Sequence, residues 1–285
     1  MTDLEPITHR RKAKPILISL YVYVVWSVVT YLLEGRIHLL QRVDVIGRFE
    51  YVVIANMIIG TILAIWLLRY YHISSGFVST KQLGFQSVNR RFWAVVGIPS
   101  VIGFVLFILQ GPVSLNPIVI SNVFAQTLPT SIAEVVVCWV VVGASFESLL
   151  LTSGKGNNEF IPKTMAAIFA AIIVGAVVAT ILFGVYHFAH SAPFNQLNTV
   201  LFLMIPGALT SIVYFIGRNI YATIIFHNFQ ALFGVMRSID ITSFTQPIYP
   251  VLIMASISML ILIAADVLLV RRKIIIPDTD SKIKK

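Results

Sequence analysis

The fold class is decided by residues 164–188, which read TMAAIFAAIIVGAVVATILFGVYHF. The whole stretch contains no Asp, Glu, Lys or Arg. A helix of roughly 20 apolar residues spans a hydrocarbon core of about 30 Å, because each residue adds about 1.5 Å. Buried strands are much shorter than this run. The stretch therefore predicts a transmembrane helix.

Similar apolar runs recur along the chain, and each is expected to cross a membrane. They are residues 15–34, 51–69, 92–110, 130–151, 164–188, 197–216, 219–236 and 249–270. Hydrophobic residues make up 58% of the sequence and charged residues 12%, which is too few for the surface of a soluble domain. A membrane β-barrel would instead show alternating segments of about ten residues. We expect an all-α polytopic membrane protein, a bundle of about eight transmembrane helices.

The polar connections between the runs are short. The longest, residues 35–50 and 70–91, are too short to fold alone. We therefore expect residues 1–285 to form a single transmembrane domain.

The basic residues are distributed unevenly between alternate connections. If the N-terminus is cytoplasmic, 17 of the 21 Lys and Arg residues flank the cytoplasmic side. The other side keeps only Arg36, Arg42, Arg48 and Arg237. Because basic residues in short loops are retained in the cytoplasm, we expect a multi-pass protein of the cell membrane with cytoplasmic N- and C-termini. Residues 271–285 then form a basic cytoplasmic tail.

The net charge of +9 follows from the same distribution. It is interpreted as a topology signal and as attraction to anionic membrane lipids, and no nucleic-acid partner is expected.

Ionisable side chains inside a spanning segment are costly, so each is a functional candidate. The candidates are Glu134, Glu147, His187, His190, His227 and Asp266. Glu134 lies near the start of its predicted run, and Asp266 lies close to Arg271 and Arg272. A position at headgroup level or a local ion pair explains both carboxylates.

Glu147, His187 and His227 lie on three different predicted helices and are harder to explain in this way. Taken singly, each histidine fits a satisfied polar residue in a helix contact. Together, one carboxylate and two imidazoles are the minimum set that activates a water and stabilises an oxyanion.

Over residues 130–235 the pattern resembles the CAAX-protease and bacteriocin-processing group of intramembrane proteases, abbreviated CPBP or Abi. Members carry Glu-Glu-x-x-x-Arg, Phe-x-x-x-His and His-x-x-x-Asn motifs in an eight-helix domain. Phe183 and His187 match the second motif, His227 begins the third, and Glu147 matches the first position of the first motif. Three positions depart from the pattern, namely Ser148, Thr152 and Ala231.

The resemblance implies roles for these residues. Glu147 and His187 would activate the attacking water, and His227 would stabilise the oxyanion. Ala231 has no donor to offer, so the amides of Gln230 and Asn228 are the candidates to replace the missing asparagine. In a simple reading of helix directions, however, Glu147 lies near the cytoplasmic end of its run and His187 near the outer end of the next.

The motifs do not decide whether a metal is used. Zinc is possible but not required, and Glu147, His187 and His227 could formally be its ligands.

Three functions remain open at this stage. The first is an intramembrane endopeptidase that hydrolyses a peptide or lipidated peptide near the membrane surface. The second is a non-catalytic family member that acts as a scaffold or a bacteriocin-immunity protein. The third is a small transporter, although paired broken helices, the sign of an inverted repeat, are not evident.

Overall fold

A computed structural model describes residues 10–41, 45–85, 90–153, 164–239 and 241–271. All regular structure in these residues is helical, which confirms the all-α class. The helices are α1 (Arg10–Thr30), α2 (Val45–Tyr51), α3 (Ala64–Leu68), α4 (Arg90–Leu109), α5 (Pro117–Glu134), α6 (Ala144–Ser153), α7 (Met165–Tyr186), α8 (Leu197–Gly217), α9 (Ile220–Ser238) and α10 (Tyr249–Ala265).

Wider or tighter helical turns extend several of these helices. π-Helical segments are Tyr31–Gly35 after α1, Val52–Leu63 between α2 and α3, Arg69–Ile73 after α3, Val135–Gly143 between α5 and α6, and Asp266–Arg271 after α10. 3₁₀ turns lie at Leu39–Gln41, His187–Ala189 and Ile241–Phe244.

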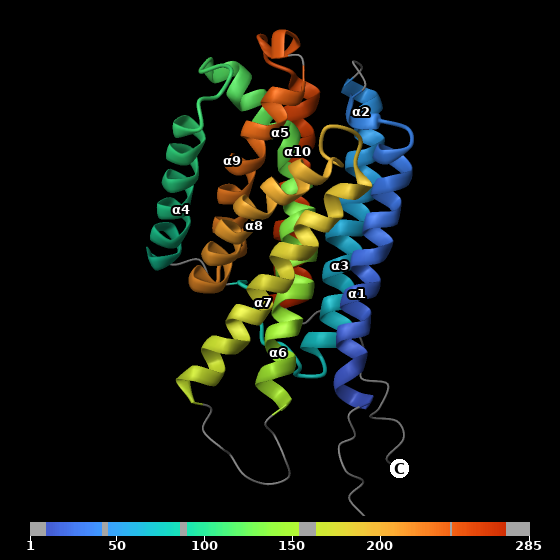
Figure 1. Cartoon of the computed structure of the whole chain (residues 1–285), viewed down its shortest axis with the longest axis vertical. Helices are drawn as coiled ribbons and strands as arrows, with labels where there is room; N and C mark the ends of the chain where they lie inside the picture. Colours follow the sequence, from blue (N-terminus) through green and yellow to red (C-terminus); the bar gives the residue numbers. More distant parts are fainter. Residues whose placement is uncertain (1–9, 42–44, 86–89, 154–163, 240, 272–285) are drawn as a thin grey trace, which may run out of the picture.

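Seven helices among the described residues are long and apolar enough to cross a membrane, which supports a multi-pass membrane protein. The eighth predicted run, residues 219–236, is also helical and corresponds to α9. It is not among the seven, because buried polar side chains such as Thr223, His227 and Asn228 lower its hydropathy. In Figure 1, α9 nevertheless runs beside α4, and it packs against α4, α5 and α8.

The predicted start of the fourth run, at residue 130, was wrong. The helix begins at Pro117 and continues through α5 and α6 to Leu151 without a break. The Asn116 side chain caps its start by accepting a hydrogen bond from the Ile118 N–H at 2.9 Å. Polar residues in its first half, including Asn122 and Ser131, lower the hydropathy but are buried inside the bundle. Glu134 therefore lies in the middle of a spanning helix, not at headgroup level.

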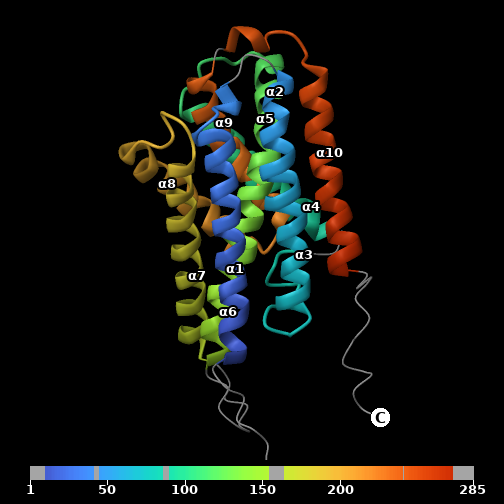
Figure 2. The same cartoon turned by 90° about the vertical axis from the view of Figure 1, so that its right-hand side faces the viewer.

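The long α5–α6 helix is the core of the bundle (Figure 1). In its most apolar 18-residue segment, 78% of the residues are buried. We call the end where α1 begins, α6 ends and α7 begins the basal end, and the end where α5 begins and α9 ends the distal end (Figures 1 and 2). Hydrogen bonds tie elements together at each end. Tyr214 of α8 donates to the Gln82 carbonyl at the basal end, and Arg48 of α2 donates to Gln126 of α5 at the distal end.

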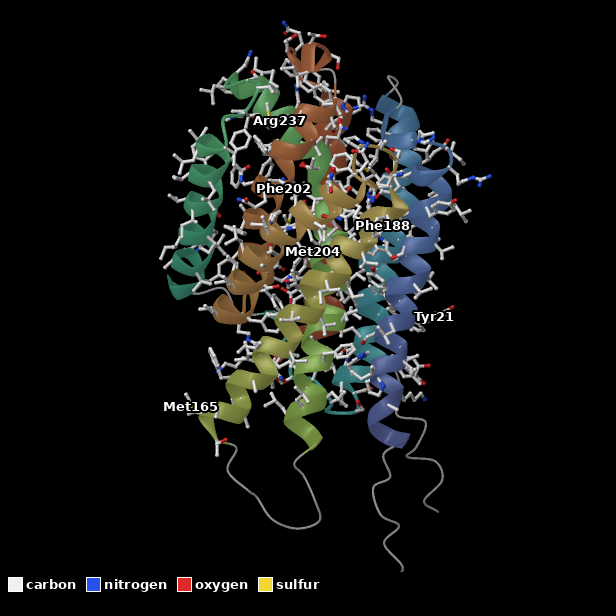
Figure 3. The ribbon with its side chains drawn as sticks, viewed as in Figure 1. Tyr21, Met165, Phe188, Phe202, Met204 and Arg237 are labelled. Carbon is white, nitrogen blue, oxygen red and sulfur yellow. The ribbon has the colours of Figure 1, made fainter. Side chains whose placement is uncertain are left out.

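The outer surface of the bundle is apolar, as lipid contact requires. Tyr21, Phe188 and Phe202 are exposed, and Tyr21 lies at the edge of the bundle in Figure 3. The buried interior holds most of the ionisable side chains of the spanning helices, which is where a membrane protein places them.

Candidate active site

A cavity of about 120 Å³ lies between the inner faces of α5, α7, α8 and α9. Its polar lining comes from these helices and from the end of the α1 extension. The polar residues are Glu34, Gln126, Thr127, Thr130, Ser131, Glu134, His187, His190, Ser191, His227, Gln230 and Ser238. Phe183, Phe194, Leu203 and Val235 are among the apolar lining residues. The cavity thus combines apolar walls with a few convergent polar groups, as binding sites do.

Glu134, the last residue of α5, is the central side chain of this cavity and is only 4% exposed. Its Oε2 atom lies 2.8 Å from His227 Nε2, which is a hydrogen-bond distance. Its Oε1 atom lies 3.9 Å from His187 Nε2, which is too long for a direct hydrogen bond. One carboxylate therefore faces two imidazoles on two other helices.

His187 is held in one orientation by its own helix. Its Nδ1–H donates to the Phe183 carbonyl at 2.8 Å, so that Nε2 is the nitrogen turned toward Glu134. The Phe183 ring packs edge-on against both His187 and His227, with centroids 4.7 and 5.0 Å away. The phenylalanine of the Phe-x-x-x-His pattern thus fixes both imidazoles by packing.

His227 is fixed by Thr210 of α8 and by the ring of Trp139. Its Nδ1 lies 3.0 Å from Thr210 Oγ1, and Thr210 in turn donates to the Pro206 carbonyl at 2.8 Å. The Trp139 ring lies 5.3 Å from the His227 ring, and its Nε1–H donates to Ser211. Trp139 is fully buried and packs against the histidine without itself lining the cavity.

The expectation that Glu147 shares this cavity was wrong. Glu147 is buried in α6, where it accepts two hydrogen bonds from the Arg218 guanidinium, at 2.5 and 2.8 Å. It lies thirteen residues beyond Glu134 on one helix, roughly 20 Å away along the axis at 1.5 Å per residue. His187 and His227 do lie together at the cavity. Glu147 lies toward the opposite end of the bundle from His187, as the simple reading of helix directions predicted.

Glu134 also matches the first position of the Glu-Glu-x-x-x-Arg pattern. In that register Val135 takes the second position and Trp139 takes the arginine position, so neither Glu134 nor Glu147 matches beyond its first residue. The sequence did contain a signal in favour of Glu134. Gln126, Thr130 and Glu134 recur every four residues, which places them on one face of a helix that starts before residue 130.

The two amide candidates have different environments. Gln230 lines the cavity, its Oε1 accepts from Gln110 Nε2 at 3.1 Å, and its buried Nε2 has no partner within the described part of the chain. Asn228 points away and is fully engaged, because its Oδ1 accepts from Ser131 and its Nδ2 donates to the Phe124 carbonyl. The structure therefore leaves Gln230 as a free donor and gives Asn228 a structural role.

A second carboxylate at the cavity wall, Glu34, was not singled out from the sequence. Glu34 is 1% exposed and accepts hydrogen bonds from the Ser191 hydroxyl and, at 2.6 Å, from the Leu40 N–H. The His190 ring stacks on His187, with centroids 5.2 Å apart, and burial holds the pKa of His190 well below its usual range. Through its bond with Ser191, Glu34 ties the turn that follows His187 to the Tyr31–Gly35 segment after α1.

The predicted zinc ligands are not brought together, since Glu147 is remote from both histidines. Among the described residues, no three His, Cys, Asp or Glu side chains form a group that could hold a metal ion. Glu134 and His227 instead bond directly to each other. The Glu134–histidine geometry is that of a hydrogen-bonded group around a polar cavity.

Residues 158–233 match the family of Rce1-like type II CAAX prenyl endopeptidases. The match includes His187 and His227 and confirms the resemblance to CPBP-family intramembrane proteases. It supports a CAAX-protease-like intramembrane endopeptidase at the level of the family. It does not extend to Glu134, which is placed beside the histidines by the fold. Searches of curated proteins and of solved structures each gave no significant match.

Proposed function

We propose that this chain is an intramembrane endopeptidase in which Glu134, not Glu147, activates the attacking water together with His187. The observation that carries the proposal is the 3.9 Å separation between Glu134 Oε1 and His187 Nε2. A water oxygen about 2.8 Å from each atom fits such a gap and bonds to both. The cavity around the two side chains has room for it.

The same geometry suggests how the reaction proceeds. Glu134 accepts a proton from the bridging water while His187 orients it, and the water oxygen attacks the peptide carbonyl carbon. The negative charge that develops on the carbonyl oxygen needs donors aimed at it. Gln230 Nε2 is free for this role, whereas both nitrogens of His227 are engaged, by Glu134 and by Thr210. The proton held by Glu134 then passes to the leaving amine, which completes hydrolysis.

The substrate proposed here is a peptide whose residues near the cleaved bond are apolar. Phe183, Phe194 and Leu203 in the cavity walls favour such residues. The family that residues 158–233 match is described as one of prenyl endopeptidases, which makes a lipidated peptide one candidate within this class.

A comparison of two glutamate substitutions tests the proposal. Glu134→Gln is nearly isosteric and removes the proton acceptor. We therefore expect the purified variant to lose the hydrolysis of quenched fluorogenic peptides. Glu50→Gln is the matched control, because Glu50 is an exposed carboxylate on α2 outside the cavity. Full hydrolysis by the Glu134→Gln protein, at equal abundance, would refute the proposal.

The second candidate function is a non-catalytic member of the same fold that acts as a scaffold or an immunity protein. It is favoured by the residues that replace motif positions, Val135, Trp139 and Ala231, none of which offers an acid, a base or an amide. In that case a biological effect of the protein survives both Glu134→Gln and His187→Ala.

A further inference from the structure

The cavity lies in one half of the bundle only. Glu134 and His227 lie near the middle of their helices, and the remaining lining residues lie between that level and the distal end. On α5 the lining residues precede Glu134, whereas on α9 they follow His227, as expected for helices that run in opposite directions. The exposed Ser238, at the distal end of α9, is among them.

Directly below Glu134, toward the basal end, the bundle is filled with side chains. A separate pocket of about 450 Å³ near that end is lined by Gln82, Glu147 and Arg218, among others, and shares no lining residue with the cavity. Trp139 is fully buried beneath the histidines, and Val140 and Val141 are fully buried on the same helix. Glu147 and Arg218 lie at the basal end and bond to each other. The route from the Glu134 carboxylate to the surface therefore leads toward the distal end.

The two ends also differ in their basic residues. Met165 marks the basal end in Figure 3 and Arg237 the distal end. Among the described residues, ten Lys and Arg residues lie toward the basal end, whereas only Arg36, Arg48 and Arg237 lie toward the distal end. Because basic residues in short connections stay in the cytoplasm, this distribution orients the basal end toward the cytoplasm.

We infer that the cavity opens on the outer face of the membrane and that its substrates are peptide segments presented from that side. The inference rests on the proposed function and narrows its substrate class. It selects exported peptides and the outer segments of membrane-inserted proteins. It excludes a prenylated tail that is presented from the cytoplasm, because the basal pocket beside Glu147 and Arg218 is separated from the histidines by the buried side chains of Trp139, Val140 and Val141.

Cysteine labelling tests the orientation independently of activity. The native Cys138 is fully buried, so it adds little background. Ser238→Cys and Thr80→Cys place exposed thiols at the distal and basal ends. In spheroplasts treated with a membrane-impermeant maleimide, we expect Ser238→Cys to be labelled at once and Thr80→Cys only after permeabilisation. The reverse pattern overturns the inference.

Sealed vesicles of opposite orientation test the side of access. The probe is a pool of water-soluble quenched fluorogenic peptides with an apolar centre and lysine residues at both ends, which do not cross a bilayer. We expect hydrolysis by right-side-out vesicles and its loss in inverted vesicles until detergent is added, with Glu134→Gln vesicles as the control.

The outcomes separate the two proposals. Hydrolysis by inverted vesicles alone overturns the outer access and leaves the endopeptidase proposal standing. Absence of Glu134-dependent hydrolysis even in detergent refutes the endopeptidase proposal, and the labelling pattern then decides the orientation of the cavity.

Discussion

Two carboxylates on one helix, Glu134 and Glu147, have opposite environments although both are almost fully buried. Glu147 is held by the two terminal nitrogens of the Arg218 guanidinium, and Arg218 also donates to the Gln82 carbonyl at 3.3 Å. Glu134 instead faces two imidazoles across a cavity.

The difference teaches how to separate structural from reactive carboxylates in a membrane bundle. Arginine stays protonated, so a bidentate arginine pair locks a carboxylate in its charged form. An imidazole ring nitrogen can bind a water, and a cavity gives room for that water. Burial alone therefore does not identify the functional residue, whereas the kind of partner does.

The largest expected effect is the fall in kcat when Glu134 is replaced. Loss of a general base typically lowers a rate by about 10²–10⁴, so Glu134→Gln is expected to lower kcat by that factor. The thermal midpoint should change little, because the amide keeps the shape and one hydrogen bond to His227. Peptide hydrolysis and thermal unfolding in detergent measure the two quantities. A large fall in thermal stability with unchanged kcat per folded molecule would reverse the roles of the two carboxylates.

At Glu147 we expect the opposite result. Removing one partner of a buried ion pair costs about 3–5 kcal/mol of unfolding free energy, since the other charge stays buried and uncompensated. Glu147→Gln should therefore unfold more readily while the folded fraction keeps its kcat. The double variant Glu147→Gln/Arg218→Gln removes both charges and should recover part of the loss. If Glu147→Gln removes hydrolysis without loss of stability, the assignment to Glu134 fails.

Much of the fold could be predicted, because apolar runs of helical length have few structural alternatives in a membrane. Residues 164–188 and 197–216 matched their helices within a residue or two. The run that starts at Pro117 was missed for a physical reason. Its inward face carries Asn122, Gln126 and Ser131, and a hydropathy window cannot distinguish buried polar residues from a loop.

The missed helix start explains why the wrong glutamate was chosen. With a helix beginning at residue 130, Glu134 belongs to the headgroup region and Glu147 remains as the buried acid. The histidines were found because Phe183 and His187 form a specific pattern and His227 lies deep in its run. The bond between Glu147 and Arg218 joins residues that are 71 positions apart, and no local pattern in the sequence indicates it.

A smaller effect is expected at Gln230, the cavity amide with an unpaired buried nitrogen. Removing one oxyanion donor typically lowers kcat by about 10²–10³, so Gln230→Leu should lower kcat by up to that factor. Asn228→Leu is the contrasting variant, because Asn228 binds Ser131 and the Phe124 carbonyl outside the cavity lining. It should lower stability more than kcat. Equal kcat for Gln230→Leu and the parent protein removes Gln230 from the mechanism.

The smallest expected effect concerns Thr210, which touches the site only through His227. Thr210→Val preserves shape but leaves His227 Nδ1 without its partner, and one such hydrogen bond contributes about 1 kcal/mol. If Thr210 positions His227 for the reaction, kcat should fall about fivefold with KM unchanged, since Thr210 does not line the cavity. Thr223→Val is the matched control: Thr223 is buried on α9 and donates to the Asn219 carbonyl at 2.8 Å, but it does not bond to a cavity residue. A structural role alone predicts equal losses of stability and unchanged kcat in both variants, whereas a positioning role predicts a fall in kcat for Thr210→Val only.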